Sequence, residues 1–376
     1  MAAPTEVYVD PSIAGDSGAG TIGDPYGDLE YALATVTQDA TNGNRINIKA
    51  GTDEVLSAAL AIVANYGTPT ISAPLIFQGY TSAAGDGGIG GISGGESVGI
   101  HTATLNYVYW FDLHLHNCGS NNCLVISRSS CGNLEVNNLT GNGIVAIDGG
   151  SVFNCNVYNI AGVGVNTSSA SKRAVLVDSC YFKNDATNKF TSAIELSDSS
   201  LATRNIVSVD STSNGIKAIG SGAHHITNNS LFSNGGESSA AIFGDGTTDW
   251  NAVIANNLIE GWSGTAGKDI DRAPNARFAI IYGNGVFNVT NTEYDDIGQQ
   301  GWLATAQDNQ VLTVSPFAQS GSDTFANRFT YFAPTATDAG VIGGAYPAEN
   351  SLDKGAAQHA DTAATTVIIK KTTRIM

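Results

Sequence analysis

The sequence has little positive charge and no long apolar run, and these two absences exclude several classes of partner. Its 376 residues contain 17 Lys and Arg against 34 Asp and Glu, a formal net charge of −17. No long basic run interrupts this acidic background, so the electrostatic footprint of nucleic-acid binding is absent and we predict no nucleic-acid partner. The longest apolar stretches, such as Ala58 to Ala64, fall far short of the roughly 20 residues that cross a bilayer, which predicts no membrane segment.

The N-terminal residues lack the features of a secretory leader. The stretch MAAPTEVYVD at positions 1–10 has neither a basic n-region nor an apolar h-region. We therefore expect that the chain as given is not exported through a signal peptide, unless a leader was removed from it.

The cysteines are few, and their number is odd, which argues against a complete disulfide framework. Their intervals of 5, 8, 24 and 25 residues do not supply the paired C-x-x-C spacing of a zinc site. We predict small thiols stacked in a core, since free cysteine is among the most buried residue types. The five are Cys118, Cys123, Cys131, Cys155 and Cys180.

An internal repeat is the strongest feature of the sequence. With 44 glycines and 14% charged residues the chain is too rich in glycine for a helical protein. An apolar anchor, which follows a double Asn at Asn228-Asn229 and at Asn256-Asn257, recurs in eight units at intervals of 21, 21, 25, 25, 24, 28 and 27 residues, and periods of this length are typical of stacked architectures. These apolar anchors are Leu115, Val136, Val157, Phe182, Val207, Leu231, Ile259 and Val286.

Two residues before the anchors the side chains are small or medium in size and change from apolar groups to Asn half way along the repeat, as in Asn229 and Asn257. Two residues after the anchors Asn dominates, as in Asn117 and Asn138. Alternate residues of a strand share a face, so each anchor marks the centre of a short strand whose ends turn. Asn side chains stacked from coil to coil can donate to one neighbour and accept from the next, and Asn also tolerates the left-handed backbone of a tight turn. We interpret the series as scaffolding rather than as a sugar or metal site, because it extends along the whole repeat.

A second short strand follows in each unit, in the segments that begin at Cys123, Gly143, Gly162, Ala193, Gly215 and Ala240. Two to three strands of 4–6 residues in each unit of about 25, separated by Gly, Asn, Ser and Asp turns, are typical of one coil of a parallel β-helix. An antiparallel sandwich stays possible, although hairpins would not be expected to repeat one anchor eight times. Residues 45–51 and 74–80 are interpreted as the first two rungs, and the glycine-rich stretch 82–99 as a lateral loop.

The N-terminal stretch combines a short strand with a helix. The strand, Val7 to Asp10, leads through a polar loop to Asp24, Pro25 and Tyr26. The helix follows, with Asp28 as the N-cap, and is expected to plug the open end of the core. Its apolar residues fall at helical spacing and are Leu29, Ala32, Leu33 and Val36. This stretch resembles the entry segment of right-handed parallel β-helix proteins of the pectate-lyase-like superfamily.

Near the C-terminus the segments VSPFAQSG from Val314 and DKGAAQ from Asp353 resemble the closing element of such proteins. The resemblance implies an all-β, right-handed parallel β-helix solenoid with an N-terminal capping helix and an irregular C-terminal cap. We predict three parts: 1–44 as N-terminal strand and capping helix, 45–300 as the β-helix, and 301–376 as C-terminal cap and tail. The β-prone tail 365–376 is expected to pair with a neighbouring subunit.

Enzymes of this fold resembling pectate lyases carry stacked Asp for calcium with an Arg or Lys base, and those resembling polygalacturonases carry three Asp with Gly-His-Gly and Arg-x-Lys. The outward row directly before the anchors contains one acid, Glu135, and so offers no stacked carboxylate pair. Elsewhere Glu195 and Asp198, with Asp210 nearby, come closest to a pair, but we interpret them as solvated or turn-capping acids. Four tryptophans could line a glycan groove, although at this density aromatic residues usually pack in the core; they are Trp110, Trp250, Trp262 and Trp302.

The histidines also give no site from sequence alone. His224 and His225 match Gly-His-Gly only loosely and are interpreted as a turn with one outward imidazole. His114 and His116 alternate with apolar residues, and a metal site built on them lacks a third ligand in the sequence pattern. The sequence therefore predicts no catalytic, cofactor-binding or metal-binding residue and no cofactor.

These observations, and the resemblance, favour a structural protein of a bacteriophage virion: a capsid-decoration, fibre or tail-spike-like β-helix with no expected catalysis. It is predicted to be made in the host cytoplasm. We expect it to assemble with other virion proteins and with copies of itself, with a trimer as one of the possible states. A host-surface glycan is the remaining predicted partner. The alternative is an extracellular polysaccharide lyase or glycoside hydrolase whose signal peptide was removed. An adhesin would share the absent active site but needs an export route.

Overall fold

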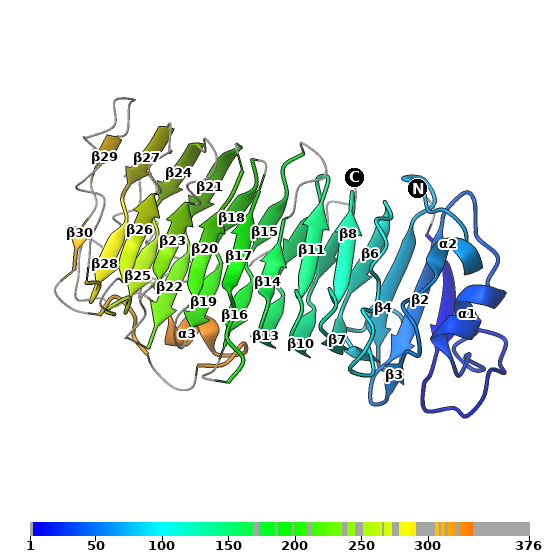
Figure 1. The fold of residues 1–376 in the computed structure, drawn as a ribbon. Helices are drawn as coiled ribbons and strands as arrows, with labels where there is room; N and C mark the ends of the chain where they lie inside the picture. The colour runs from blue at the N-terminus through cyan, green and yellow to red at the C-terminus, as the bar shows by residue number, and fades with distance from the viewer. Residues whose placement is uncertain are drawn as a thin grey trace, which may run out of the picture.

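The fold is a parallel β-helix, which confirms the predicted fold class (Figure 1). The computed structural model describes residues 3–167, 173–184, 187–197, 199–209, 213–220, 222–234, 239–244, 251–264, 267–272, 278–290, 305–307, 310–312, 315–319 and 323–333. Within them, the chain winds through three parallel sheets, and neighbouring strands of each sheet come from successive coils. No helix in this part of the chain is long and apolar enough to cross a membrane.

The three sheets divide the strands by their place in the coil. The first sheet contains β1 (Thr5–Val9), β2 (Asn44–Lys49), β4 (Leu75–Tyr80), β6 (Val108–Phe111), β9 (Ser130–Gly132), β12 (Ser151–Phe153), β15 (Leu176–Asp178), β18 (Leu201–Thr203), β21 (Ala223–Thr227), β24 (Asn251–Ala255), β27 (Phe278–Tyr282) and β29 (Thr305–Gln307). The second contains β3 (Asp53–Val55), β5 (Gly90–Ser93), β7 (Leu113–Gly119), β10 (Glu135–Leu139), β13 (Asn156–Ile160), β16 (Tyr181–Lys183), β19 (Ile206–Val209), β22 (Ser230–Ser233), β25 (Leu258–Glu260), β28 (Gly285–Phe287) and β30 (Gln310–Val311). The third contains β8 (Leu124–Ser127), β11 (Ile144–Ile147), β14 (Val163–Asn166), β17 (Ser192–Leu196), β20 (Asn214–Ala218), β23 (Ala240–Gly244) and β26 (Lys268–Arg272).

The anchor repeat of the sequence is the inward row of the second sheet. Each anchor pairs with the next in register, from Leu115 opposite Val136 to Ile259 opposite Val286, and all eight are buried. The second strand predicted in each unit is a strand of the third sheet. One side chain per coil thus fills the same place in a continuous apolar core, and this explains the period.

The paired asparagines have two separate structural roles. Three residues before the anchor the backbone is left-handed, with φ of 57° at Asn228 and 56° at Asn256, a conformation that Asn adopts more readily than most residues. Two residues before the anchor the side chains form a buried ladder, in which Nδ2 of Asn229 donates to Oδ1 of Asn257 at 3.0 Å. The same contact joins Asn205 to Asn229 at 3.1 Å and Asn257 to Asn284 at 2.9 Å. The scaffolding interpretation of these residues is confirmed.

All five cysteines are buried and free, as predicted. Cys155 and Cys180 occupy the ladder position in the two coils before Asn205, so thiols and amides fill equivalent places. Burial raises the pKa of both thiols well above the usual range, which keeps them protonated and unreactive.

Helix α1 (Leu29–Thr35) covers the N-terminal end of the core (Figure 1). The carboxylate of Asp28 accepts the backbone N–H of Tyr31 at 2.7 Å and caps the helix, as predicted. Leu29, Ala32 and Leu33 are fully buried and join the main core cluster. Two further short helices complete the described elements, α2 (Ile62–Asn65) and α3 (Arg328–Tyr331).

The glycine-rich stretch 82–99 is only partly a loop, and its interpretation as a lateral loop is wrong at its centre. Residues Gly90–Ser93 form β5, a buried strand between β3 and β7. The glycines are needed because a Cβ at Gly90 would meet the Ile48 carbonyl at 2.5 Å, and a Cβ at Gly91 would meet the Asp53 carboxylate at 1.7 Å. Close packing, and not loop flexibility, accounts for the composition there.

Residues 315–319 and 323–333 lie against the outer face of the second sheet, where α3 sits beside β16, β19 and β22 (Figure 1). Phe317 and Phe332 pack on Tyr181, Ile206 and Leu258, whose side chains point out of the sheet. This covering segment explains why the outward row becomes apolar in its second half. Most of the predicted C-terminal part, including Val314, the DKGAAQ segment and the tail 365–376, lies outside the described residues.

Candidate functional site

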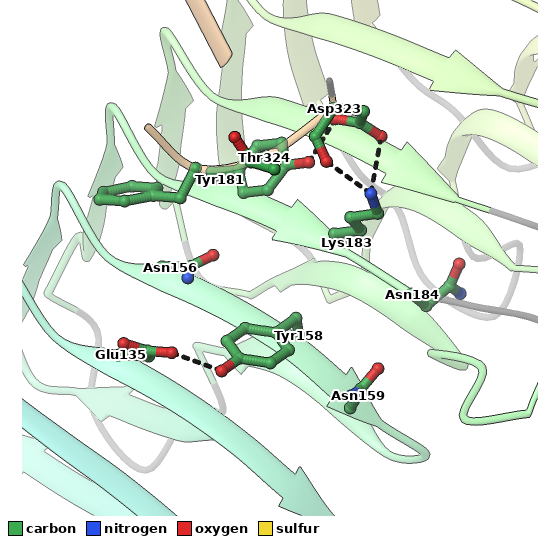
Figure 2. A pocket seen from close by; sticks show the side chains of 10 residues that line it. Glu135, Asn156, Tyr158, Asn159, Tyr181, Lys183, Asn184, Asp323 and Thr324 are labelled. Carbon is green, nitrogen blue, oxygen red and sulfur yellow. Dashed lines mark hydrogen bonds and ion pairs between the residues drawn. The ribbon is translucent and has the colours of Figure 1, made fainter. Parts of the chain in front are cut away.

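A hollow of ≈ 310 Å³ lies on the outer face of the second sheet, beside the covering segment (Figure 2). Strands β10, β13 and β16 supply its floor, and residues 323–325 supply one wall. The side chains that give it chemical character are a glutamate, two tyrosines, a lysine and an aspartate. They are Glu135, Tyr158, Tyr181, Lys183 and Asp323.

Asp323 fixes the wall of the hollow to the sheet. The Tyr181 hydroxyl donates to its Oδ1, and Ser208 Oγ donates to its Oδ2 at 2.8 Å. Lys183 Nζ lies 3.2 Å from Oδ2 and donates to the Asp323 carbonyl at 2.6 Å. Burial raises the pKa of Tyr181, and the Asp323 carboxylate adds to the rise, so this hydroxyl remains a donor. Three side chains therefore contact the Asp323 carboxylate, two as hydrogen-bond donors and one as an ion-pair partner.

Glu135 and Tyr158 form a second pair on the floor of the hollow. The Tyr158 hydroxyl donates to Oε1 of Glu135 across neighbouring strands (Figure 2). Burial raises the pKa of Tyr158, and the hydrogen bond to Glu135 raises it further, so the phenol stays protonated. Glu135 is partly exposed and can still meet a ligand in the hollow.

A cluster of metal-type ligands lies on the same face, beside the hollow. His114 and His116 project from β7 with rings stacked at 4.3 Å, and Nε2 of His116 lies 3.0 Å from Oδ2 of Asp53 in β3. Burial and the neighbouring His116 lower the pKa of His114, against the opposing effect of Glu135 and Asp53. The sequence interpretation that this histidine pair lacks a third ligand is wrong, because the fold brings Asp53 from the preceding coils.

The structure places the other sequence candidates elsewhere. Glu195 lies within β17 with its side chain 16% exposed, Oε2 lies 3.5 Å from Lys217 Nζ, and Oε1 accepts from Asn166 at 3.3 Å, so it is a paired strand residue and not the solvated or turn-capping acid that was predicted. Asp198 and Asp210 lie outside the described residues. Trp110 and Trp262 are fully buried and belong to the core, while Trp250 and Trp302 are outside the described residues.

The interpretation of His224 and His225 as a turn is wrong, since both lie in β21. Of these two histidines, His225 is exposed, which confirms the one outward imidazole that was predicted, and His224 is fully buried. Burial lowers the pKa of His224 to about 4, partly opposed by the Ile219 backbone, so this histidine is neutral in the fold.

Sequence reasoning missed Asp53, Lys183 and Asp323 as site residues. Asp53 lies in a coil whose anchor position holds a glutamate, Glu54, and so falls outside the apolar repeat. Asp323 reaches the sheet from a segment with no period. The sequence did contain an indication that a segment covers this face. Tyr181, Ile206 and Leu258 are large and largely apolar at outward positions, which would otherwise be exposed to solvent.

Comparison with known proteins identifies the fold and leaves the family open. No family model matches the chain, and no curated protein matches it. Among solved structures, the pectate lyase Pel9A is similar with 14% identity and a TM-score of 0.60, over 96% of this chain and 97% of that one. A rhamnogalacturonan lyase has 14% identity and a TM-score of 0.45, over 84% of this chain and 90% of that one. The GH136 lacto-N-biosidase from Eubacterium ramulus has 11% identity and a TM-score of 0.42, over 82% and 68%. The chain therefore has the parallel β-helix fold of pectate-lyase-like proteins.

Proposed function

We propose that this protein binds an acidic polysaccharide in the hollow on the second sheet and cleaves it by elimination. The observation that carries the proposal is the hollow itself, which is lined by the Glu135–Tyr158 pair on its floor and by Lys183 where it pairs with Asp323 in the wall (Figure 2). A fold shared with a pectate lyase is compatible with this function but does not decide it, because this architecture hosts many functions.

The chemical mix in the hollow suits a sugar chain. Tyr158 offers an aromatic face with a polar tip, and the amides of Asn156 and Asn159 offer both donors and acceptors for hydroxyl groups. The Lys183 ammonium is paired with Asp323 but is 39% exposed, and its third N–H group can donate to the carboxylate of a uronic acid.

Elimination fits the residues better than hydrolysis does. Glycoside hydrolysis uses two carboxyl groups, but of the two that line the hollow, Asp323 is already occupied by Tyr181, Lys183 and Ser208. Elimination needs one base. The Glu135 carboxylate takes the proton from C5 of the uronate, and the electron pair forms the C4–C5 double bond while the C4–O bond breaks. The Tyr158 hydroxyl passes its proton to the leaving oxygen and regains one from Glu135.

The test is an assay of the purified chain on polygalacturonate, alginate and a neutral glucan, read by the ultraviolet absorbance of the unsaturated product. We expect product from an acidic polymer only. Glu135→Gln should lower the rate by roughly 10²–10⁴-fold, the usual contribution of a general base. Glu195→Gln is the matched control on the third sheet and should keep full activity.

Two results would overturn the proposal. New reducing ends without unsaturated non-reducing ends would mean hydrolysis. Absence of both binding and cleavage for every acidic polymer would contradict the glycan site. A structural role in a bacteriophage virion, with the host cytoplasm as place of synthesis and copies of itself as partners, stays a prediction, because the fold is compatible with either function. A trimer in light scattering of the untagged chain, with no activity on any polymer, would favour it.

A further inference from the structure

We propose that Asp53, His114 and His116 form a binding site for a divalent transition-metal ion, of the Zn²⁺ class, on the second sheet beside the hollow. The three residues are the one group of this kind among the described residues. The site stands on its own geometry and does not require that the proposed lyase activity is correct.

The register of the second sheet brings the three ligands together. Asp53 pairs with Gly91, and Gly91 pairs with His114, so the aspartate and the first histidine share one row across β3, β5 and β7. His116 follows two residues later and projects from the same face. One ligand atom from each residue lies within 4.8 Å of the others.

The observed separations are close to those that one ion requires. A zinc ion binds imidazole nitrogen and carboxylate oxygen at about 2.0–2.2 Å, so two of its ligand atoms lie roughly 3–4 Å apart. Nε2 of His116 and Oδ2 of Asp53 are 3.0 Å apart, within that span. An ion can replace this contact with small rotations of the side chains.

Gly91 creates the space in which the carboxylate lies. It stands between Asp53 and His114 in the row, and a Cβ at this position would lie 1.7 Å from Oδ1 of Asp53 and 2.7 Å from its Cγ. Any other residue in the middle strand would therefore displace the aspartate. The missing side chain lets a carboxylate from β3 reach toward histidines two strands away.

The histidine rings are already held in place. Their planes lie at 14° to one another, with centroids 4.3 Å apart. Nδ2 of Asn137 donates to Nε2 of His114 at 2.8 Å and holds this ring. With Nε2 as the ligand atom the ion would replace this contact, and with Nδ1 as the ligand atom the amide would turn its oxygen to accept from Nε2–H. Preorganised rings lose less freedom on binding an ion, and this favours affinity.

The ligand types select the class of ion. Two imidazoles and one carboxylate suit Zn²⁺ and its neighbours in the first transition row, whereas Ca²⁺ and Mg²⁺ prefer oxygen ligands alone. The Asp53 side chain is 45% exposed, so an ion can enter from solvent. Three protein ligands also leave a coordination position open, as in zinc sites that bind a ligand.

The three ligands lie on the same face of the second sheet as the hollow. Glu135 pairs in register with His114, and Tyr158 is the register partner of Asn137, which itself pairs with His116. The metal site and the floor of the hollow are thus neighbours on one sheet. If the hollow binds an acidic polymer, as proposed above, the ion would hold an anionic group of the same ligand.

The test is a calorimetric titration of the untagged, EDTA-treated full chain with ZnCl₂, with CaCl₂ as comparison and the visible absorption of bound Co²⁺ as a second measurement. We expect one Zn²⁺ per chain and no comparable Ca²⁺ binding. Asp53→Asn should weaken Zn²⁺ binding by at least about tenfold, and His116→Asn should do the same. Gly91→Ala keeps all three ligands but displaces the carboxylate, and it should weaken binding as well.

Two control variants remove similar groups from other places. Asp16→Asn removes a carboxylate from an exposed loop, and His225→Asn removes an exposed imidazole from β21; both should keep wild-type affinity. Circular dichroism and thermal unfolding establish that each variant is folded. Equal Zn²⁺ affinity in wild type and Asp53→Asn, or absence of stoichiometric Zn²⁺ binding, would overturn the site. Loss of Zn²⁺ binding in Asp53→Asn, His116→Asn and Gly91→Ala, with polymer binding unchanged, would support the metal site and contradict only the inference that the ion holds part of the polymer. Stoichiometric Zn²⁺ binding by a wild-type chain that neither binds nor cleaves an acidic polymer would contradict only the proposed function.

Discussion

His224 and His225 are adjacent in β21, yet the pleat of the strand gives them opposite surroundings. The side chain of His224 is 0% exposed and points into the solenoid, while His225 faces solvent. Burial lowers the pKa of His224 from 6.5 to about 4, so the folded protein holds it neutral over a range where the unfolded chain takes up a proton.

The consequence is a loss of stability in mild acid. A histidine with a depressed pKa in the fold contributes stability that is present above pH 6.5 and is lost as the pH falls toward about 4. In this window the free energy of unfolding should fall by up to roughly 1.4 kcal/mol per pH unit from this one group. His224→Leu should reduce that slope in urea unfolding measured from pH 7 to pH 4.5. His225→Leu should leave the slope unchanged, and equal slopes in both variants would contradict the assignment.

At the scale of structural elements, the asparagine ladder joins consecutive coils by side-chain hydrogen bonds. Asn229 donates to Asn257 and to the Ala202 carbonyl, and its Oδ1 accepts the backbone and side-chain N–H groups of Asn205. All of these groups are buried. The side chain therefore satisfies polar groups of the coil before it and of the coil after it, using both its donor and its acceptor.

The two asparagines of a pair should respond to substitution in different ways. Asn229→Ala leaves buried donors and acceptors unpaired and should cost at least roughly 1–3 kcal/mol. Asn228→Gly retains the left-handed backbone at φ 57° and should change the free energy of unfolding by less than about 0.5 kcal/mol. Urea unfolding of both variants measures the difference. Equal destabilisation would mean that the pair acts as one unit, contrary to the separate roles assigned here.

The elements that the sequence predicts are those that repeat. The anchors Leu115 to Val286 could be aligned because each coil places one apolar side chain in the same core position, so the register follows from the spacing. Asp53 and Asp323 could not be placed in the same way. The first lies in a three-residue strand beside a buried Glu54, and the second reaches the sheet through contacts that no periodicity describes. The candidate site lies where the repeat meets these irregular segments.

At the scale of the whole molecule, the solenoid stacks its coils along one axis and carries a large excess of negative charge. The net charge is −17 at pH 7, and the folded chain holds these charges closer together than the unfolded chain does. Local ion pairs, such as Arg204 with Asp178 and Lys49 with Asp10, offset a part of this repulsion but are few beside 34 acidic residues. Repulsion among the remaining carboxylates should therefore oppose folding at low ionic strength.

Added salt should stabilise the fold at neutral pH. Raising NaCl from 0.01 M to 0.15 M shortens the Debye length from about 30 Å to about 8 Å, which screens repulsion between coils more than it weakens contacts within an ion pair. We expect the midpoint of thermal unfolding at pH 7 to rise by about 2–4 °C, the equivalent of roughly 1 kcal/mol. The control is the same salt series near the sequence pI of ≈ 4.5, where the net charge vanishes and the rise should disappear. A midpoint that falls with salt at pH 7 would show that ion pairs, and not the net charge, dominate the electrostatics of the solenoid.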